Sequence, residues 1–151
     1  TATTSQANTL SAETTGVITA TISDGDMATL DGITESGNAL AITVRDTTVS
    51  AAELITLSSK TTKDVTVNSS TIIGTAAQVI TAYTATDSIK GLGNEAVTVN
   101  SGESSVSSAN ILSEATTGLI TATISDGEMG KLLSLNGNNN SYTIAISDDS
   151  L

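Results

Sequence analysis

The residues best suited to chemistry are four carboxylates in two short acidic segments. Asp24 and Asp26 flank a glycine in the first segment, and Asp126 and Glu128 flank a glycine in the second. Carboxylate oxygens are the ligands that Ca²⁺ prefers, and a complete site takes about six to eight oxygens. The sequence therefore makes these four residues candidate ligands for weak calcium binding, and it predicts no other cofactor.

The same carboxylates have a structural alternative, which we favour. Each acidic segment follows a strand-like run and opens a helix-like one, so its negative charge would lie at the positive N-terminal end of a helix. One segment alone is too sparse to complete the coordination of Ca²⁺. Further oxygens would have to come from a neighbouring part of the fold, such as Asp46 or the pair Asp148 and Asp149.

Catalysis is not predicted. The chain contains no His and no Cys, so it lacks both the commonest general base and the thiol nucleophile. The two carboxylate pairs are the remaining acid–base dyads, and their role at helix ends is the simpler expectation. A Ser–Lys pair stays open, but no particular pair stands out. We therefore predict that the protein is not an enzyme.

Threonine and asparagine form a second candidate site, on one face of the predicted strands. Side chains alternate between the two faces of a strand, so the apolar residues face the helices and the polar ones face outward. The array is not regular, because Ala41 and Ala145 interrupt it, and ordinary β-propensity on a solvated face is the alternative to ice or glycan binding. The predicted binding face comprises Thr19, Thr21, Thr43, Thr66, Asn68, Thr98, Asn100, Thr121, Thr123 and Thr143.

An internal repeat organises these residues. The segment GVITATISDGDM, from Gly16, returns as GLITATISDGEM, from Gly118, at an offset of 102 positions. Residues 5–49 match residues 107–151 without a gap. Because repeats decide the architecture, we take residues 1–151 as a single repeat domain of about one and a half copies.

Strand and helix signals alternate within the repeat. Helix starts are indicated by capping boxes, in which a Ser or Thr precedes a Glu or Gln by three positions: Ser50 with Glu53, Thr75 with Gln78, and Ser125 with Glu128. A helix is expected from Ala76 to about Ala85, with loops at residues 70–74 and 88–94. Strand-like runs begin near Gly16, Ala39, Asp64, Ala96, Gly118 and Tyr142.

This alternation predicts an α/β solenoid. Strands joined by helices must run parallel, and such crossovers are right-handed. The sequence therefore predicts a right-handed solenoid of about six coils of about 25 residues each, within the range of strand-plus-helix repeats. We expect one parallel sheet, with Ile144 and Ile146 facing the helices like the apolar residues of the earlier strands.

Composition excludes several partners. The net charge of −11, with only five Lys and Arg residues, argues against nucleic acid and against anionic membrane surfaces. No apolar run approaches the roughly 18 residues of a membrane span, so membrane insertion is not predicted. The sequence has no initiating Met and no signal peptide, and we therefore expect a processed product or an excised piece.

Three sequence segments resemble a known family. Residues 49–54 (VSAAEL), 73–83 (IGTAAQVITAY) and 91–99 (GLGNEAVTV) resemble the repeat arrays of very large secreted surface proteins of marine cyanobacteria and other marine bacteria. The resemblance implies an extracellular or cell-surface location and a structural or adhesive role, and it supplies no catalytic residue. Many such proteins carry Ca²⁺-binding Gly-Gly-x-Gly-x-Asp nonapeptides, and this chain has none.

The expected function is that of a structural repeat module in a secreted cell-surface array or extracellular filament. The alternative is a surface- or ligand-binding module, an adhesin that uses the Thr/Asn face for glycan or ice. Stacked coils leave a strand edge open at each end. We therefore expect the chain to be a fragment of a longer array or a filament subunit, with neighbouring repeats or identical subunits docked head to tail.

Overall fold

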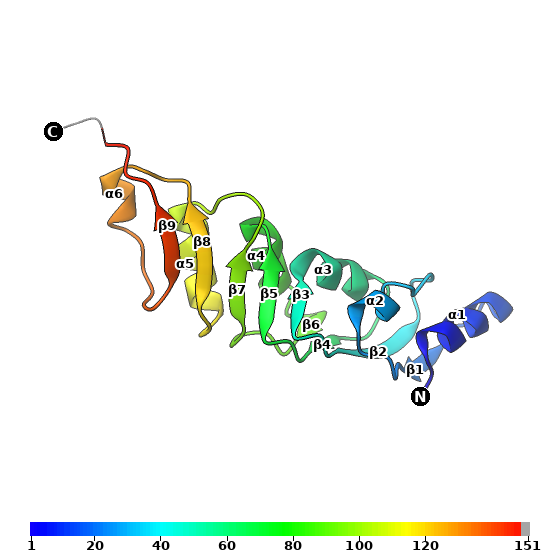
Figure 1. Cartoon of the computed structure of the whole chain (residues 1–151). Helices are drawn as coiled ribbons and strands as arrows, with labels where there is room; N and C mark the ends of the chain where they lie inside the picture. The colour runs from blue at the N-terminus through cyan, green and yellow to red at the C-terminus, as the bar shows by residue number, and fades with distance from the viewer. Residues whose placement is uncertain (149–151) are drawn as a thin grey trace.

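The computed structural model describes residues 1–148. Strand–helix units follow one another along an elongated stack, with α1 (Thr4–Glu13) at one end and α6 (Met129–Leu132) at the other (Figure 1). The helices between them are α2 (Met27–Leu30), α3 (Ala51–Ser59), α4 (Ala76–Thr84) and α5 (Val106–Ala115). We call each strand–helix unit a coil.

The strands are short and fall into two sheets, in the orders β1-β2-β4-β6 and β3-β5-β7-β8-β9. The first sheet contains β1 (Thr19–Thr21), β2 (Ala39–Val44), β4 (Val65–Val67) and β6 (Ile89–Lys90). The second contains β3 (Thr48–Ser50), β5 (Thr71–Gly74), β7 (Ala96–Val99), β8 (Ile120–Ile124) and β9 (Ser141–Ile144).

Every strand pairing in the described residues is parallel. Thr19 lies opposite Ala39 and Thr71 opposite Ala96, so paired residues are 20 to 25 positions apart along the chain. Two parallel strands that pair must be joined by a crossover connection, and here the crossover fits within these 20 to 25 residues. The predicted α/β fold with parallel strands is therefore confirmed.

The prediction of one sheet is wrong. In the middle of the chain each coil contains two short strands before its helix, as with β4 and β5 before α4, and each strand joins a different sheet. Two of these strands, β5 and β6, lie in the segments expected to be loops, residues 70–74 and 88–94. They are only four and two residues long, too short for an alternating pattern to be recognised in the sequence.

The core consists of aliphatic side chains from the inward faces of the strands and of the helices that pack on them. Leu40, Val65, Val97 and Ile120 are each at most 1% exposed, as the alternation of apolar residues predicts. Ile144 is an exception, because β9 is the last strand of its sheet and no described element covers it. Its exposure is 41%, and that of Ile146 is 62%, so the expected burial of this pair against helices is wrong.

Helix starts agree only partly with the predicted capping boxes. Thr75 and Gln78 form the expected box at α4, which begins at Ala76 and ends at Thr84. Ser50 precedes α3 but its side chain makes no capping bond, and α6 is preceded by Glu128 rather than Ser125. The boxes predicted at Ser50 and Ser125 are therefore wrong, because an apt residue pattern does not fix the side-chain rotamers that a box needs.

The internal repeat is visible in the element boundaries. Helices α1 and α2 correspond to α5 and α6 at an offset of 102 residues at both ends. Strands β1 and β2 correspond to β8 and β9 at the same offset, although β8 is longer than β1 by one residue at each end and β9 ends two residues earlier than β2. The sequence match continues to Leu151, which lies outside the described residues.

Candidate functional site

Two of the four candidate carboxylates join neighbouring coils. The Oδ2 atom of Asp24 accepts a hydrogen bond of 2.7 Å from the backbone amide of Thr4, the first residue of α1. Asp126 repeats the contact, accepting a bond of 2.8 Å from the amide of Val106, the first residue of α5. Each carboxylate comes 20 residues after the amide that it binds. It therefore caps the helix of the coil before its own.

Helices α2 and α6 are capped by a carboxylate in the same way. Asp46 accepts a hydrogen bond of 2.7 Å from the amide of Met27, the first residue of α2. Asp148 accepts one of 2.8 Å from Met129, the first residue of α6. First-turn amides have no partner within their own helix, and a negative charge at this end is favourable. Four of the described helices therefore start on a carboxylate from the following coil.

The other two candidates, Asp26 and Glu128, contact residues three positions away in the sequence. Asp26 precedes α2, and its Oδ1 atom accepts hydrogen bonds from the amide and the hydroxyl of Thr29, at 2.9 and 2.7 Å. These two bonds hold the pKa of Asp26 below its usual value. Glu128 forms an ion pair of 3.6 Å with Lys131, which also pairs with Asp126 at 3.3 Å. The structure thus brings Asp126 and Glu128 together around one lysine.

The pKa of Asp126 reflects this arrangement. The amide of Val106 is the largest cause that lowers it below the ordinary aspartate value, and Lys131 acts in the same direction. The pKa of Lys131 is raised in turn, chiefly by its hydrogen bond to Asp126. Both shifts favour the charged forms, so the contact between α5 and the following coil is charged at neutral pH.

Calcium coordination gains no support from this geometry. Within residues 1–148, no group of three or more His, Cys, Asp or Glu side chains is placed to hold a metal ion. Asp24, Asp26 and Asp126 bind helix amides, which is the alternative that the sequence favoured. Asp149, named as a further ligand, lies outside the described residues. Calcium binding at Asp24, Asp26, Asp126 and Glu128 stays an untested prediction.

Asparagines add a second set of bonds between coils. Asn8 on α1 donates to the carbonyl of Gly32 at 2.7 Å and accepts from the amide of Thr34 at 3.2 Å. Asn110 on α5 makes the matching pair of bonds, to the carbonyl of Ser134 and from the amide of Asn136, at 2.8 and 2.9 Å. One side chain therefore holds a helix to the loop of the next coil in both copies.

Asn38 and Asn140 reach in the opposite direction. The Oδ1 atom of Asn38 accepts from the amide of Ile18 at 2.9 Å, and its Nδ2 donates to the hydroxyl of Ser11 at 2.7 Å. Asn140 accepts from the amide of Ile120 at 3.1 Å and donates to Ser113 at 3.4 Å. Neither asparagine was predicted from the sequence to have a role. The signal was present, since each asparagine recurs at the repeat offset.

A buried glutamate closes the longest coil. Glu95 is 3% exposed, and its Oε2 atom accepts bonds from the hydroxyl of Tyr83 at 3.0 Å and from the amides of Gly93 and Asn94 at 2.8 and 3.2 Å. Burial raises the pKa of Tyr83 above its usual value, and the charge of Glu95 adds to the shift. A buried carboxylate needs hydrogen-bond donors, and the three donors here fix the conformation of the loop at residues 91–95.

The predicted Thr/Asn face is divided between the two sheets. Thr19, Thr21, Thr43 and Thr66 lie on the first sheet, whereas Thr98, Thr121, Thr123 and Thr143 lie on the second. Asn68 and Asn100 are exposed and follow the ends of β4 and β7. The expectation of one continuous flat face is therefore wrong, because the middle coils turn between two strands. Hydroxyls still lie in register, with Thr43 opposite Thr66 and Thr123 opposite Thr143.

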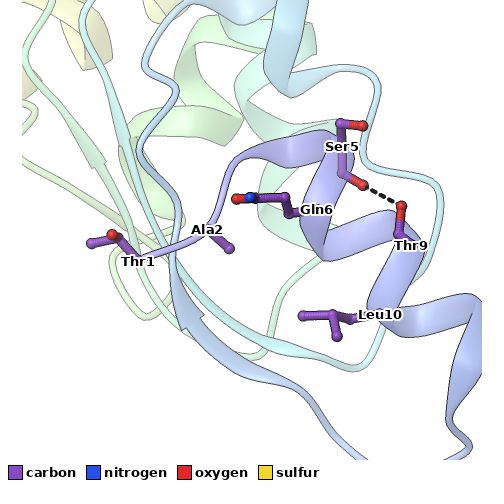
Figure 2. A pocket seen from close by; sticks show the side chains of 6 residues that line it. All are labelled: Thr1, Ala2, Ser5, Gln6, Thr9 and Leu10. Carbon is purple, nitrogen blue, oxygen red and sulfur yellow. Dashed lines mark hydrogen bonds between the residues drawn. The ribbon is translucent and has the colours of Figure 1, made fainter.

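Three surface hollows of the described residues are open, and most of the side chains that line them are polar. One lies against α1 and is lined by Thr1, Ala2, Ser5, Gln6, Thr9 and Leu10 (Figure 2). Thr9 uses its hydroxyl to bond the carbonyl of Ser5 at 3.0 Å, within its own helix. This hollow contains no acid–base pair that would suggest catalysis.

The chain matches no protein-family model, no curated protein and no solved structure. Among the described helices, none has the length and apolar character needed to cross a membrane.

Proposed function

We propose that the protein is a structural module of a secreted cell-surface array or extracellular filament, built as a right-handed solenoid whose coils stack in an open series. The observation that carries this proposal is the repetition of the coil-to-coil contacts. Asp24 and Asp126 cap the preceding helix in the same way, and Asn8 and Asn110 bind the following loop in the same way.

This use of polar side chains supports a structural role. A contact that recurs with the period of the sequence can be extended by adding coils, because each coil interacts with its neighbours only. The partners in this proposal are neighbouring repeats or identical subunits docked head to tail. Such a contact does not close on itself, so it produces a fibre rather than a dimer. The extracellular location is proposed from the family resemblance.

A second candidate function uses the hydroxyls of β8 and β9. Thr121 lies opposite Ser141 and Thr123 opposite Thr143, and all four residues are exposed. Neighbouring strands are about 4.8 Å apart, so these hydroxyls form a small regular patch. A glycan or ice surface is the ligand class that fits it, and the patch is much smaller than the face expected from the sequence.

Negative-stain electron microscopy and analytical ultracentrifugation of the purified chain would test the structural proposal. We expect concentration-dependent filaments, and we expect Ile144→Lys with Ile146→Lys to prevent them, because both side chains are exposed on the last coil. Ile111→Lys is a matched control, since Ile111 is 44% exposed on the side of α5. Circular dichroism would show that each variant folds. A monodisperse wild-type monomer whose two end coils are ordered and exposed would contradict the proposal.

A further inference from the structure

The outer face of the first coil presents side chains that are covered elsewhere in the same molecule. We define this first-coil face by Leu10, Thr14, Gly16 and Ile18. Leu10 is 52% exposed, Thr14 and Gly16 are exposed, and Ile18 is half-buried. Figure 2 shows Leu10 on the side of α1 that borders the open hollow.

The internal repeat shows the same face in its covered form. The residues equivalent to Leu10, Thr14 and Ile18 are Leu112, Thr116 and Ile120, and their exposures are 0%, 7% and 0%. They are covered by the preceding coil, because α4 packs against α5 and β7 pairs with β8. One sequence pattern therefore occurs twice, once beneath the coil of residues 75–99 and once facing solvent.

The cover over the second copy is made by specific backbone atoms as well as by apolar contact. The hydroxyl of Thr116 donates to the carbonyl of Glu95 at 2.8 Å, and the amide of Thr117 donates to the carbonyl of Gly93 at 2.9 Å. A Cβ atom placed on Gly118 would lie 2.1 Å from the carbonyl oxygen of Glu95. A glycine is required there because the backbone of the preceding coil approaches so closely.

The first copy keeps these features without that neighbour. Gly16 stands where Gly118 stands, yet the nearest atom to a Cβ placed on it is the Thr14 hydroxyl oxygen, at 3.4 Å. The hydroxyl of Thr14 accepts a bond of 3.0 Å from the amide of Gly16, as the hydroxyl of Thr116 does from the amide of Gly118. The first-coil face thus has the shape and the hydrogen-bonding groups for the same cover.

We propose that the first-coil face is a docking site for one particular coil type, the equivalent of residues 75–99, presented by another copy of the same repeat. In the docked form the hydroxyl of Thr14 donates to the carbonyl equivalent to that of Glu95, and the amide of Thr15 to the carbonyl equivalent to that of Gly93. This inference rests on the proposed structural function and adds the identity of the neighbour.

The last coil of an identical chain is a poorer occupant of this face. It ends on β9, which corresponds to β2. One edge of β2 pairs with β1 and the other with β4, so the strand that follows a β2-type strand is of the β4 type and does not belong to a coil like the first. The loop at residues 91–95, which Glu95 and Tyr83 hold in place, supplies both acceptor carbonyls. No bonded Tyr–Glu pair of this kind is seen elsewhere in residues 1–148. The repeat therefore fixes the order in which coils follow one another.

The test extends the full chain at its N-terminus. A copy of residues 71–102 is joined directly to Thr1, which reproduces the join between residues 102 and 103, and the control carries the same 32 residues in scrambled order. Hydrogen exchange of the α1 amides, followed by mass spectrometry, reports the cover. We expect exchange to slow about tenfold or more with the native extension, because covered helices open less often, and to stay unchanged with the scrambled one.

Two variants make the test specific to the first-coil face. Leu10→Glu and Gly16→Ala should each abolish the protection in the extended chain while leaving the melting temperature of the unextended chain nearly unchanged, since both positions are exposed there. Equal exchange of α1 with the native and the scrambled extension would overturn the inference. If the unextended chain at high concentration protected α1 as strongly as the native extension does, end-to-end docking of identical chains would suffice and the inference would be overturned.

The outcomes also separate this inference from the proposed function. Filaments that form while the α1 amides of the natively extended chain stay unprotected would support the structural role and contradict the assignment of the neighbour. Protection by the native extension, without any filament of the parent chain, would support the assignment of the neighbour and contradict the proposed filament role.

Discussion

Replacing Gly118 with alanine is the sharpest test of how closely the coils approach. Gly118 lies just before β8, and a Cβ atom at this position would be 2.1 Å from the carbonyl oxygen and 2.4 Å from the carbonyl carbon of Glu95. Ordinary non-bonded contacts between heavy atoms are about 3.5 Å. The two backbone segments would therefore have to separate by roughly 1 Å, at a place where neither is free to rotate away.

The cost can be estimated from the bonds beside Gly118. A separation of this size breaks the 2.8 Å bond from the Thr116 hydroxyl to Glu95 and stretches the 2.9 Å bond from the amide of Val97 to the carbonyl of Leu119. Each such bond contributes about 1 kcal/mol, and overpacking adds about 1–3 kcal/mol. We expect Gly118→Ala to lower the free energy of unfolding by about 3–5 kcal/mol.

Urea denaturation followed by circular dichroism would measure this change, and Gly16→Ala is its matched control. The control makes the same substitution at the equivalent position of the first copy, where the nearest atom is 3.4 Å away. Its free energy of unfolding should stay within about 1 kcal/mol of the parent value, because alanine for glycine at an unstrained position is nearly neutral or stabilising. Equal losses in the two variants would refute the reasoning.

Three further predictions concern single side chains. Thr75→Ala should cost about 1 kcal/mol because it removes a capping box, whereas Ser50→Ala, whose side chain makes no capping bond, should change thermal stability by only a few tenths of a kcal/mol. Glu95→Ala should cost about 2–4 kcal/mol in chemical denaturation, since two backbone amides and the Tyr83 hydroxyl lose their acceptor. The pKa of Asp126 is lowered in the folded state, so its stabilisation is present above the unfolded value of about 3.9 and is lost as the pH falls through the folded value. Asp126→Asn should therefore show a smaller drop in melting temperature than the parent between about pH 5 and about pH 2.

The parallel α/β organisation could be predicted because its signals are local. The inward residues of β2, such as Leu40 and Ile42, alternate with outward ones and are buried as expected. The helix from Ala76 was also predicted, since its capping box is formed within four consecutive residues. The predicted number of strands in each coil was wrong. β5 and β6 exist because neighbouring strands offer them pairing partners, and a segment of two to four residues does not encode that pairing by itself.

The candidate site illustrates a similar limit. The carboxylates were predicted to lie at the N-termini of the helices that follow them, which is correct for Asp26 and α2. Asp24 and Asp126 instead bind helices 20 residues earlier, and that choice depends on the register in which the coils stack. Local rules describe pairs three or four residues apart and contain no such register. The identity of Asp24 with Asp126 across the repeat was the only available signal for a shared partner.

The register of the strands also determines how the protein would respond to tension. Because every described pairing joins residues 20 to 25 positions apart, a load along the chain falls on the outermost coil and then on the next. Each detached coil would release about 80 Å of extended chain, at roughly 3.5 Å per residue, whereas a stacked coil spans only about 5 Å along the axis. Extension would therefore proceed in discrete steps, each resisted by the strand pairing between coils and, at α1, α2, α5 and α6, also by the aspartate bonds.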